Sequence, residues 1–157
     1  MSQVLEEIQD YWTRRASGFS EAVTEEIGTE SGKNWNLFFQ QIFPQPFNIL
    51  DLGAGAGFFT LILAYLGHTV TAVDYSVGMI EKIRENIVNA GVKAEVLRMD
   101  AQQLSFTDEV FDAVVSRNLI WNLEKPEQAY SEVFRVLKPG GTMVIMDGNF
   151  YLHHHNE

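Results

Sequence analysis

The chain has 157 residues, of which 46% are hydrophobic, so it can bury one sizeable core and is short for a second domain. Its net charge of −10 opposes the phosphate backbone of nucleic acid, which excludes nucleic acid as the expected partner. There is no cysteine for thiol chemistry and no apolar run long enough to span a membrane. These features predict a soluble, cytoplasmic protein without a membrane partner.

The first part of the chain, residues 1–46, is expected to form two helices at 3–15 and 33–43, joined by a polar stretch at 17–32. From residue 47 onward, apolar runs of strand length alternate with amphipathic segments of helix length. This alternation is the pattern of consecutive βαβ units and predicts an α/β fold with a parallel sheet.

Five strands are expected, and helices connect them. The strands are placed at 47–51, 69–74, 94–99, 111–117 and 142–147. Among the helices, one spans 58–66, one is stopped by Gly91, and one is ended by Pro139-Gly140-Gly141.

The first expected strand runs into the segment Asp51-Leu52-Gly53-Ala54-Gly55-Ala56-Gly57. Three alternating glycines let the backbone turn sharply and approach a ligand closely, which is typical of a nucleotide-cofactor loop. Such a loop takes either the pyrophosphate of a dinucleotide or the methionine part of S-adenosylmethionine, which carries a sulfonium and an amino group. The negatively charged carboxylate of Asp51 suits the sulfonium and amino group of S-adenosylmethionine better than it suits a pyrophosphate.

Two further acids follow the second and third expected strands. Asp74 lies 21 residues after Gly53, where a carboxylate can accept both ribose hydroxyls, and this supports NAD and S-adenosylmethionine equally. Asp100 can accept the amino group of adenine and favours S-adenosylmethionine. Both acids have the alternative role of capping the next helix, and the two roles are compatible.

With these residues in place, the chain resembles the class I S-adenosylmethionine-dependent methyltransferases, in particular the type 11 small-molecule enzymes. The resemblance rests on ILDLGAGAGFFT at 49–60, VDYSVGMI at 73–80, RMDAQQLSF at 98–106, FDAVVSRNLIWNL at 111–123 and VLKPGGTMVI at 136–145. It implies a Rossmann-like, doubly wound sheet in the order 3-2-1-4-5. Residues 47–157 would bind S-adenosyl-L-methionine, with S-adenosyl-L-homocysteine as product, and residues 1–46 would form a lid.

The resemblance also implies a set of cofactor-binding residues. Those near the methionine part and the reacting methyl are Asp51, Gly53, Gly55, Gly57, Arg117 and Asn118. Those near the ribose and adenine are Asp74, Tyr75, Met79, Asp100, Ala101 and Gln102. Tyr11 would close over the cofactor, although for Tyr11 and Trp12 anchoring of the helix is the better explanation. Trp121 belongs either to the core or to a substrate wall.

The expected reaction is methyl transfer to a small-molecule acceptor. The positive charge of the sulfonium activates the leaving group, so the main task of the protein is to align the methyl donor with the acceptor. We identify no general base and no metal ligand. The alternative is an S-adenosylmethionine-binding module without turnover. An NAD-dependent oxidoreductase ranks third, since a pyrophosphate loop explains Asp51 and Asp100 poorly. The histidines at 153–155 are either a tag or native sequence and are assigned no metal.

The family normally continues to a sixth and an antiparallel seventh strand. This chain stops about ten residues after the fifth expected strand, so we expect a fragment of a longer protein rather than a minimal variant. The fifth strand, 142–147, would then be an unpaired hydrophobic edge. We expect self-association through this edge.

Overall fold

The computed structural model describes residues 2–148, so the histidines at 153–155 lie outside the described residues. A parallel sheet in the order β3-β2-β1-β4-β5 forms its centre. The strands are β1 (Asn48–Leu52), β2 (Thr69–Asp74), β3 (Glu95–Arg98), β4 (Phe111–Arg117) and β5 (Leu137–Met146). The predicted α/β class and strand order 3-2-1-4-5 are therefore confirmed.

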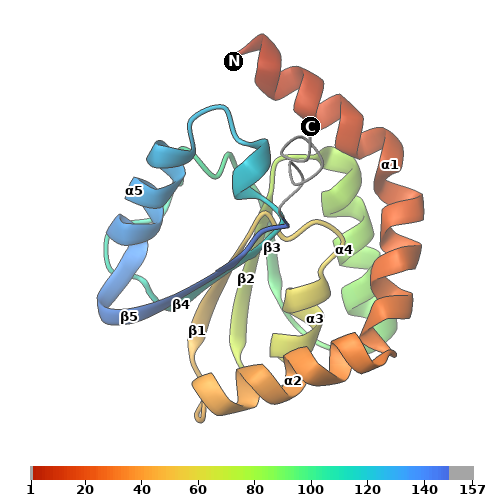
Figure 1. Cartoon of the computed structure of the whole chain (residues 1–157), viewed down its shortest axis with the longest axis vertical. Helices are drawn as coiled ribbons and strands as arrows, with labels where there is room; N and C mark the ends of the chain where they lie inside the picture. The colour runs from red at the N-terminus through yellow and green to blue at the C-terminus, as the bar shows by residue number, and fades with distance from the viewer. Residues whose placement is uncertain (1, 149–157) are drawn as a thin grey trace, which may run out of the picture.

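Helices cover both faces of this sheet (Figure 1). The helices are α1 (Gln3–Ile27), α2 (Glu30–Ile42), α3 (Phe58–Tyr65), α4 (Val77–Ala90), α5 (Pro126–Val136) and the short 3-10 helix η1 (Ile120–Asn122). Helix α5 lies on one face, α3 and α4 lie on the other, and α1 runs along the outer side of α4. Within residues 2–148, no helix is long and apolar enough to cross a membrane.

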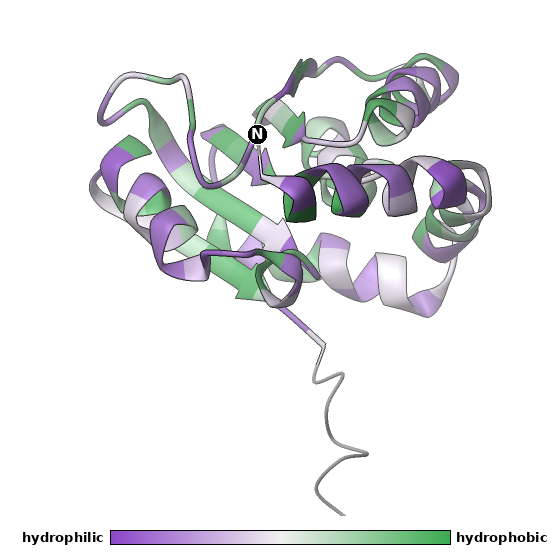
Figure 2. Cartoon of the chain, turned by 90° about the horizontal axis from the view of Figure 1, so that it is seen from above, coloured by the Kyte–Doolittle hydropathy of each residue, from purple (hydrophilic) through white to green (hydrophobic). Residues whose placement is uncertain are grey.

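Strand β1 contributes to the cores on both faces, because successive side chains of a strand point in opposite directions. Ile49 packs in the cluster that contains Phe59 of α3, whereas Leu50 and Leu52 pack in the cluster that contains Val133 of α5. Figure 2 shows the apolar strands in the interior and polar residues along the outer helices. Burial on both faces explains why the strands appear in the sequence as short apolar runs.

Helix α1 is longer than predicted. The prediction ended it at residue 15, with a polar connection at 17–32, but the helix continues to Ile27. Its buried residues Ala16, Ser20 and Val23 form one face, and the Ser20 hydroxyl accepts a 2.9 Å hydrogen bond from Asn86 Nδ2 of α4. This face is partly polar, so its helical period is not visible as an apolar stripe.

Strand β5 begins earlier than predicted. The prediction placed a helix end at residues 139–141 and the strand at 142–147, but α5 ends at Val136 and β5 starts at Leu137. A register shift between Phe111 and Ala113 of β4 absorbs the additional residues. Among the described residues β5 pairs with β4 alone, so the predicted edge strand is confirmed.

Candidate functional site

The glycine loop connects the carboxyl end of β1 to the first turn of α3. Gly53, Gly55 and Gly57 have φ angles of 68°, 56° and 98°, which residues with a side chain rarely adopt. The N–H of Ala54 donates a 2.9 Å hydrogen bond to the carbonyl of Val73, which fastens the loop to β2. The loop lies at the sheet edge where open α/β folds bind their ligands.

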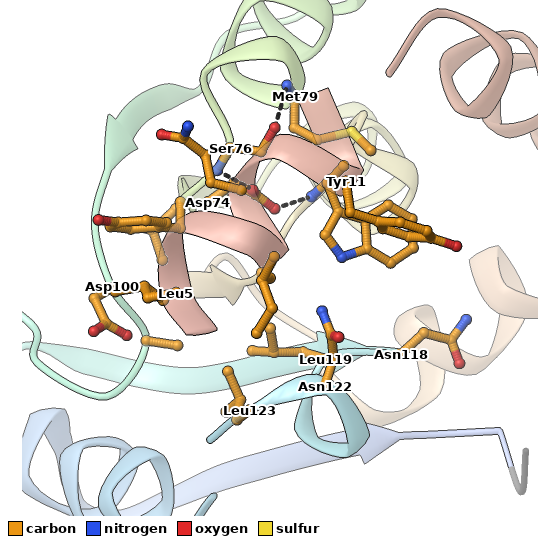
Figure 3. Close-up of a pocket in the computed structure, with 18 of the residues that line it drawn as sticks. Leu5, Tyr11, Asp74, Ser76, Met79, Asp100, Asn118, Leu119, Asn122 and Leu123 are labelled. Atoms are coloured by element: carbon orange, nitrogen blue, oxygen red, sulfur yellow. Dashed lines mark hydrogen bonds between the residues drawn. The ribbon is translucent and has the colours of Figure 1, made fainter. Parts of the chain in front are cut away.

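Asp74, the last residue of β2, is bonded to this loop. Its Oδ2 accepts a hydrogen bond from the N–H of Gly55, and its Oδ1 accepts one from the N–H of Ser76, both of 2.9 Å (Figure 3). Burial raises the pKa of Asp74 above its ordinary value, and these hydrogen bonds oppose the rise. A carboxylate has about four lone-pair sites, so Asp74 can still accept hydrogen bonds from ligand hydroxyls.

The turn after β3 brings Asp100 to the same side of the sheet. Asp100 Oδ1 accepts a 2.9 Å hydrogen bond from the N–H of Gln102. The side-chain carbonyl of Gln102 accepts one of 2.7 Å from the N–H of Lys125, which ties this turn to the start of α5. The Tyr75 ring lies beneath the guanidinium of Arg98, at 4.8 Å from Cζ to the ring centroid.

Helix α1 supplies an aromatic wall. The rings of Tyr11 and Trp12 meet edge to face with centroids 5.1 Å apart, and Trp12 meets Phe19 similarly at 5.6 Å. The hydroxyl oxygen of Thr13 lies 3.0 Å from that of Ser76, the N-cap of α4. Tyr11 and Trp12 also line the pocket described below. Packing of these rings on α1 is therefore compatible with a position in the site.

The carboxyl end of β4 leads into the remaining wall. Asn118 has a φ of 57°, and its N–H donates a 2.7 Å hydrogen bond to the carbonyl of Met146 on β5. The chain then turns into η1, and Leu119 and Leu123 lie on the side of the pocket opposite Asp74 (Figure 3).

Together these elements surround a pocket of about 450 Å³, within the size range of small-molecule sites. Eleven of the thirteen predicted residues line it, namely Tyr11, Gly53, Gly55, Asp74, Tyr75, Met79, Asp100, Ala101, Gln102, Arg117 and Asn118. No group of side chains among residues 2–148 is arranged to hold a metal ion.

The other two predicted residues, Asp51 and Gly57, lie outside the lining. Asp51 is 2% exposed and accepts a 2.6 Å hydrogen bond from the hydroxyl of Thr60 on α3. Burial raises the pKa of Asp51 to about 7, although the hydrogen bonds from Thr60 act against it. A Cβ on Gly57 would lie 2.8 Å from the Ile83 side chain, so the glycine permits the loop to pack on α4. Both residues shape the loop, and their contact with a ligand stays a prediction.

The sequence analysis did not predict all of the residues that line the pocket. From α1 come Leu5, Ile8, Gln9, Arg15 and Phe19; from the β2 and β3 ends Val73, Ser76 and Met99; and after β4 Leu119, Asn122, Leu123 and Glu124. Trp121, left open between core and substrate wall, lines the pocket and is 37% exposed. The spacing of Leu5, Ile8 and Trp12 at i, i+3 and i+7 was the available signal for an inward apolar face. The early end predicted for this helix placed Phe19 in a connection.

The parallel sheet, the glycine loop and the pocket at the carboxyl ends of the strands define a cofactor-binding α/β protein of the Rossmann-like class. A family model described as a methyltransferase domain matches residues 50–145. The chain belongs to this family, the type 11 S-adenosylmethionine-dependent methyltransferases, as the resemblance implied. The methyl donor of this family is S-adenosylmethionine, the cofactor predicted for this chain.

Individual relatives show how far the likeness extends. The chain is 40% identical over 99 residues to the demethylmenaquinone methyltransferase of Clavibacter sepedonicus, covering 63% of this chain and 40% of that protein. It is 37% identical over 103 residues to the phosphatidylethanolamine N-methyltransferase of Cereibacter sphaeroides, covering 63% and 49%. It therefore spans less than half the length of these two curated relatives.

A solved structure shows the same fold. The PH0226 protein from Pyrococcus horikoshii OT3 superposes with a TM-score of 0.69 at 32% identity, over 76% of this chain and 59% of that chain.

Proposed function

We propose that the pocket binds S-adenosylmethionine and that the protein transfers its methyl group to a small-molecule acceptor. The observation that carries this proposal is the convergence of eleven predicted residues on one pocket beside the glycine loop. When bound, the cofactor supplies an electrophilic methyl group with its own leaving group. The residues of the chain have to hold the methyl donor and the acceptor in line. This alignment alone can lower the activation barrier by about 7–11 kcal/mol in favourable cases.

The polar groups of the pocket fit an adenosyl cofactor. Asp74 offers carboxylate oxygens to ribose hydroxyls, and Asp100 offers them to an exocyclic amine. Tyr75 and Met79 supply apolar surface for a flat base. The lining also contains Glu124. Together with Asp74 and Asp100 it gives the pocket three acidic side chains, which repel the negatively charged pyrophosphate of a dinucleotide.

We assign the acceptor to the space between the first half of α1 and residues 119–124. Leu5, Leu119 and Leu123 line this part, which favours an acceptor with an apolar body. The two segments are joined directly, since the Ser2 hydroxyl donates a 2.7 Å hydrogen bond to Glu124. The two curated relatives are named for demethylmenaquinone and phosphatidylethanolamine, so these are the first acceptors to test. No residue is proposed as a general base.

Residues 1–46 are proposed to act as the lid of the site. The first half of α1 is joined to the pocket rim by side-chain hydrogen bonds, between Thr13 and Ser76 and from Ser2 to Glu124. Ala16 and Val23, farther along α1, are anchored in the core, so the first turns of α1 are the part that would move. The cytoplasmic location of the protein is a separate point and stays a prediction.

Transfer of a labelled methyl group from S-adenosylmethionine to a panel of acceptors tests the proposed function. We expect label in at least one acceptor with the unaltered protein, and its loss in Asp74→Ala. Lys82→Gln, which removes a surface ion pair with Glu85, is the control and should behave like the parent. Cofactor binding without transfer to any acceptor would favour the binding module without turnover.

A further inference from the structure

Arg98, the last residue of β3, contacts two residues of the pocket lining without lining the pocket itself. The two residues are Tyr75, directly after β2, and Gln9 on α1. Arg98 Nε donates a 2.9 Å hydrogen bond to the main-chain carbonyl of Tyr75, and Arg98 Nη2 donates one to the side-chain carbonyl of Gln9. One guanidinium therefore joins the end of β3, the segment after β2 and the first half of α1.

The same guanidinium also supports the ring of Tyr75. Arg98 Cζ lies 4.8 Å from the ring centroid, which is the position of a cation–π contact. A guanidinium is planar and carries its five N–H donors along its edge, so it can lie over a ring while it donates to two acceptors. The ammonium group of a lysine is a single point and cannot combine these contacts. The arrangement therefore depends on arginine at this position.

The backbone on both sides of this contact is fixed. Arg98 of β3 pairs with Asp74 of β2 in the parallel register, and the N–H of Met99 donates a 3.1 Å hydrogen bond to the carbonyl of Asp74. Tyr75 follows Asp74 directly, and Ser76 is the N-cap of α4. Because strand pairing and a helix cap hold the main chain, the guanidinium acts on the orientation of the Tyr75 ring.

Gln9 connects this contact to the lid. The first half of α1 is joined to the rim of the pocket by side-chain hydrogen bonds from Ser2 to Glu124, between Thr13 and Ser76, and from Arg98 to Gln9. The bond to Gln9 extends to the adenine side of the site, because its donor also lies over the Tyr75 ring. When the first turns of α1 move away from the pocket, the guanidinium loses Gln9 as an acceptor and is free to turn away from the ring.

We propose that Arg98 is a positioning residue that couples closure of α1 to the orientation of the Tyr75 ring beside the adenine of the cofactor. The inference rests on the proposed function, since it requires an adenosyl ligand next to Tyr75. Arg98 acts through Tyr75 and Gln9 rather than on the ligand itself. It slows release of the ligand, because the ring and the lid have to move together.

Surface plasmon resonance of the immobilised full chain with S-adenosylhomocysteine tests this inference, since it measures association and dissociation rates separately. Arg98→Met keeps the length of the side chain but removes its charge and its donors. It should raise the dissociation rate roughly three- to tenfold and change the association rate little. Gln9→Leu should also raise the dissociation rate. The double variant should release the ligand no faster than Arg98→Met alone, because both changes break the same coupling.

Arg84→Met is the matched control. Arg84 on α4 donates a 3.2 Å hydrogen bond to the carbonyl of Val96 on β3 but does not line the pocket, so both rates should equal those of the parent. Arg98→Lys keeps the charge without the planar donors, so it should recover at most part of the loss.

Effects of Arg98→Met and Gln9→Leu that multiply in the double variant would overturn the inference, as would an unchanged dissociation rate in Arg98→Met. Equal acceleration by Arg84→Met, or full recovery in Arg98→Lys, would also overturn it. If Arg98→Met does not fold, Gln9→Leu decides, since an unchanged dissociation rate in that variant contradicts the coupling. If the parent protein does not bind S-adenosylhomocysteine, the proposed function itself fails.

Discussion

The two carboxylate oxygens of Asp74 are divided between two backbone donors: Oδ2 accepts from the N–H of Gly55, and Oδ1 accepts from the N–H of Ser76, each at 2.9 Å. Gly55 belongs to the glycine loop and Ser76 is the N-cap of α4. The residue predicted to hold the ribose therefore also fixes the loop, so its replacement affects both stability and ligand affinity.

Asp74→Ala is expected to weaken binding of S-adenosylhomocysteine by tenfold or more and to lower the free energy of unfolding by about 1–3 kcal/mol. Asp74→Asn keeps one oxygen acceptor, so it should lose less stability while still losing affinity. Calorimetry and urea denaturation measure the two effects separately. Unchanged affinity in Asp74→Ala would remove this residue from the site.

Substitutions at two glycines separate the effect of backbone strain on stability from the effect of the glycine loop on ligand binding. A Cβ on Gly53 would lie 2.7 Å from Leu119, whereas one on Gly67 would meet nothing within 4 Å, and both glycines have positive φ. Gly53→Ala and Gly67→Ala should each destabilise the fold by about 1 kcal/mol through backbone strain, and Gly53→Ala must in addition displace the Leu119 side chain. Only Gly53→Ala should weaken ligand binding in calorimetry. Equal weakening by both variants would contradict a specific role of the loop.

The buried carboxyl of Asp51 predicts a particular pH dependence of stability. Burial raises its folded-state pKa from 3.8 to about 7, so between these values the folded state binds more protons than the unfolded state. This group therefore lowers the free energy of unfolding as pH rises through that window. In the unliganded protein, Asp51→Asn should be more stable than the parent near pH 8, by about 1–3 kcal/mol, and this gain should shrink toward pH 4.

Urea denaturation of the parent and Asp51→Asn across this pH range provides the measurement. His68 contributes equally to both proteins and cancels in their difference, whereas Asp74, whose pKa is also raised by burial and whose charge acts on Asp51, contributes with the same sign as Asp51. Burial lowers the pKa of His68, so its contribution has the opposite sign and stability from this residue rises with pH. A difference that does not change with pH would show that Asp51 is not the titrating group.

The edge strand β5 is predicted to mediate self-association with a second copy of the chain. Met143 on β5 is 43% exposed, and an unpaired strand edge can pair with another. Met143→Lys should shift the population toward monomer in sedimentation velocity over a concentration series. Val88→Lys, at a site on α4 that is 77% exposed, is the control and should not. A monomeric parent at every concentration, with freely exchanging β5 amides, would contradict this prediction.

The sequence predicted the sheet well, because a parallel sheet buried on both faces leaves short apolar runs such as β2 and β4 that stand out from amphipathic helices. The end of α1 and the start of β5 were wrong for physical reasons. The inner face of α1 is partly polar at Ser20, and the Gly140-Gly141 pair that suggests a break lies inside a bulged strand.

Within the site, most of the lining was predicted because the carboxyl ends of parallel strands meet at one edge. The orientation of Asp51 was also available in the sequence. Asp51 and Ile49 alternate with Leu50 and Leu52, so Asp51 faces the α3 side of the sheet, where Thr60 binds it. The position of Phe19 was not available, since it depends on where a long helix lies over the sheet.

Calorimetric titration of the unaltered chain with S-adenosylmethionine, S-adenosylhomocysteine and NAD tests the central claim most directly. The pocket should bind both adenosyl ligands at one shared site, and NAD should give no heat of binding. Binding of NAD together with no binding of either adenosyl ligand would contradict the proposed function.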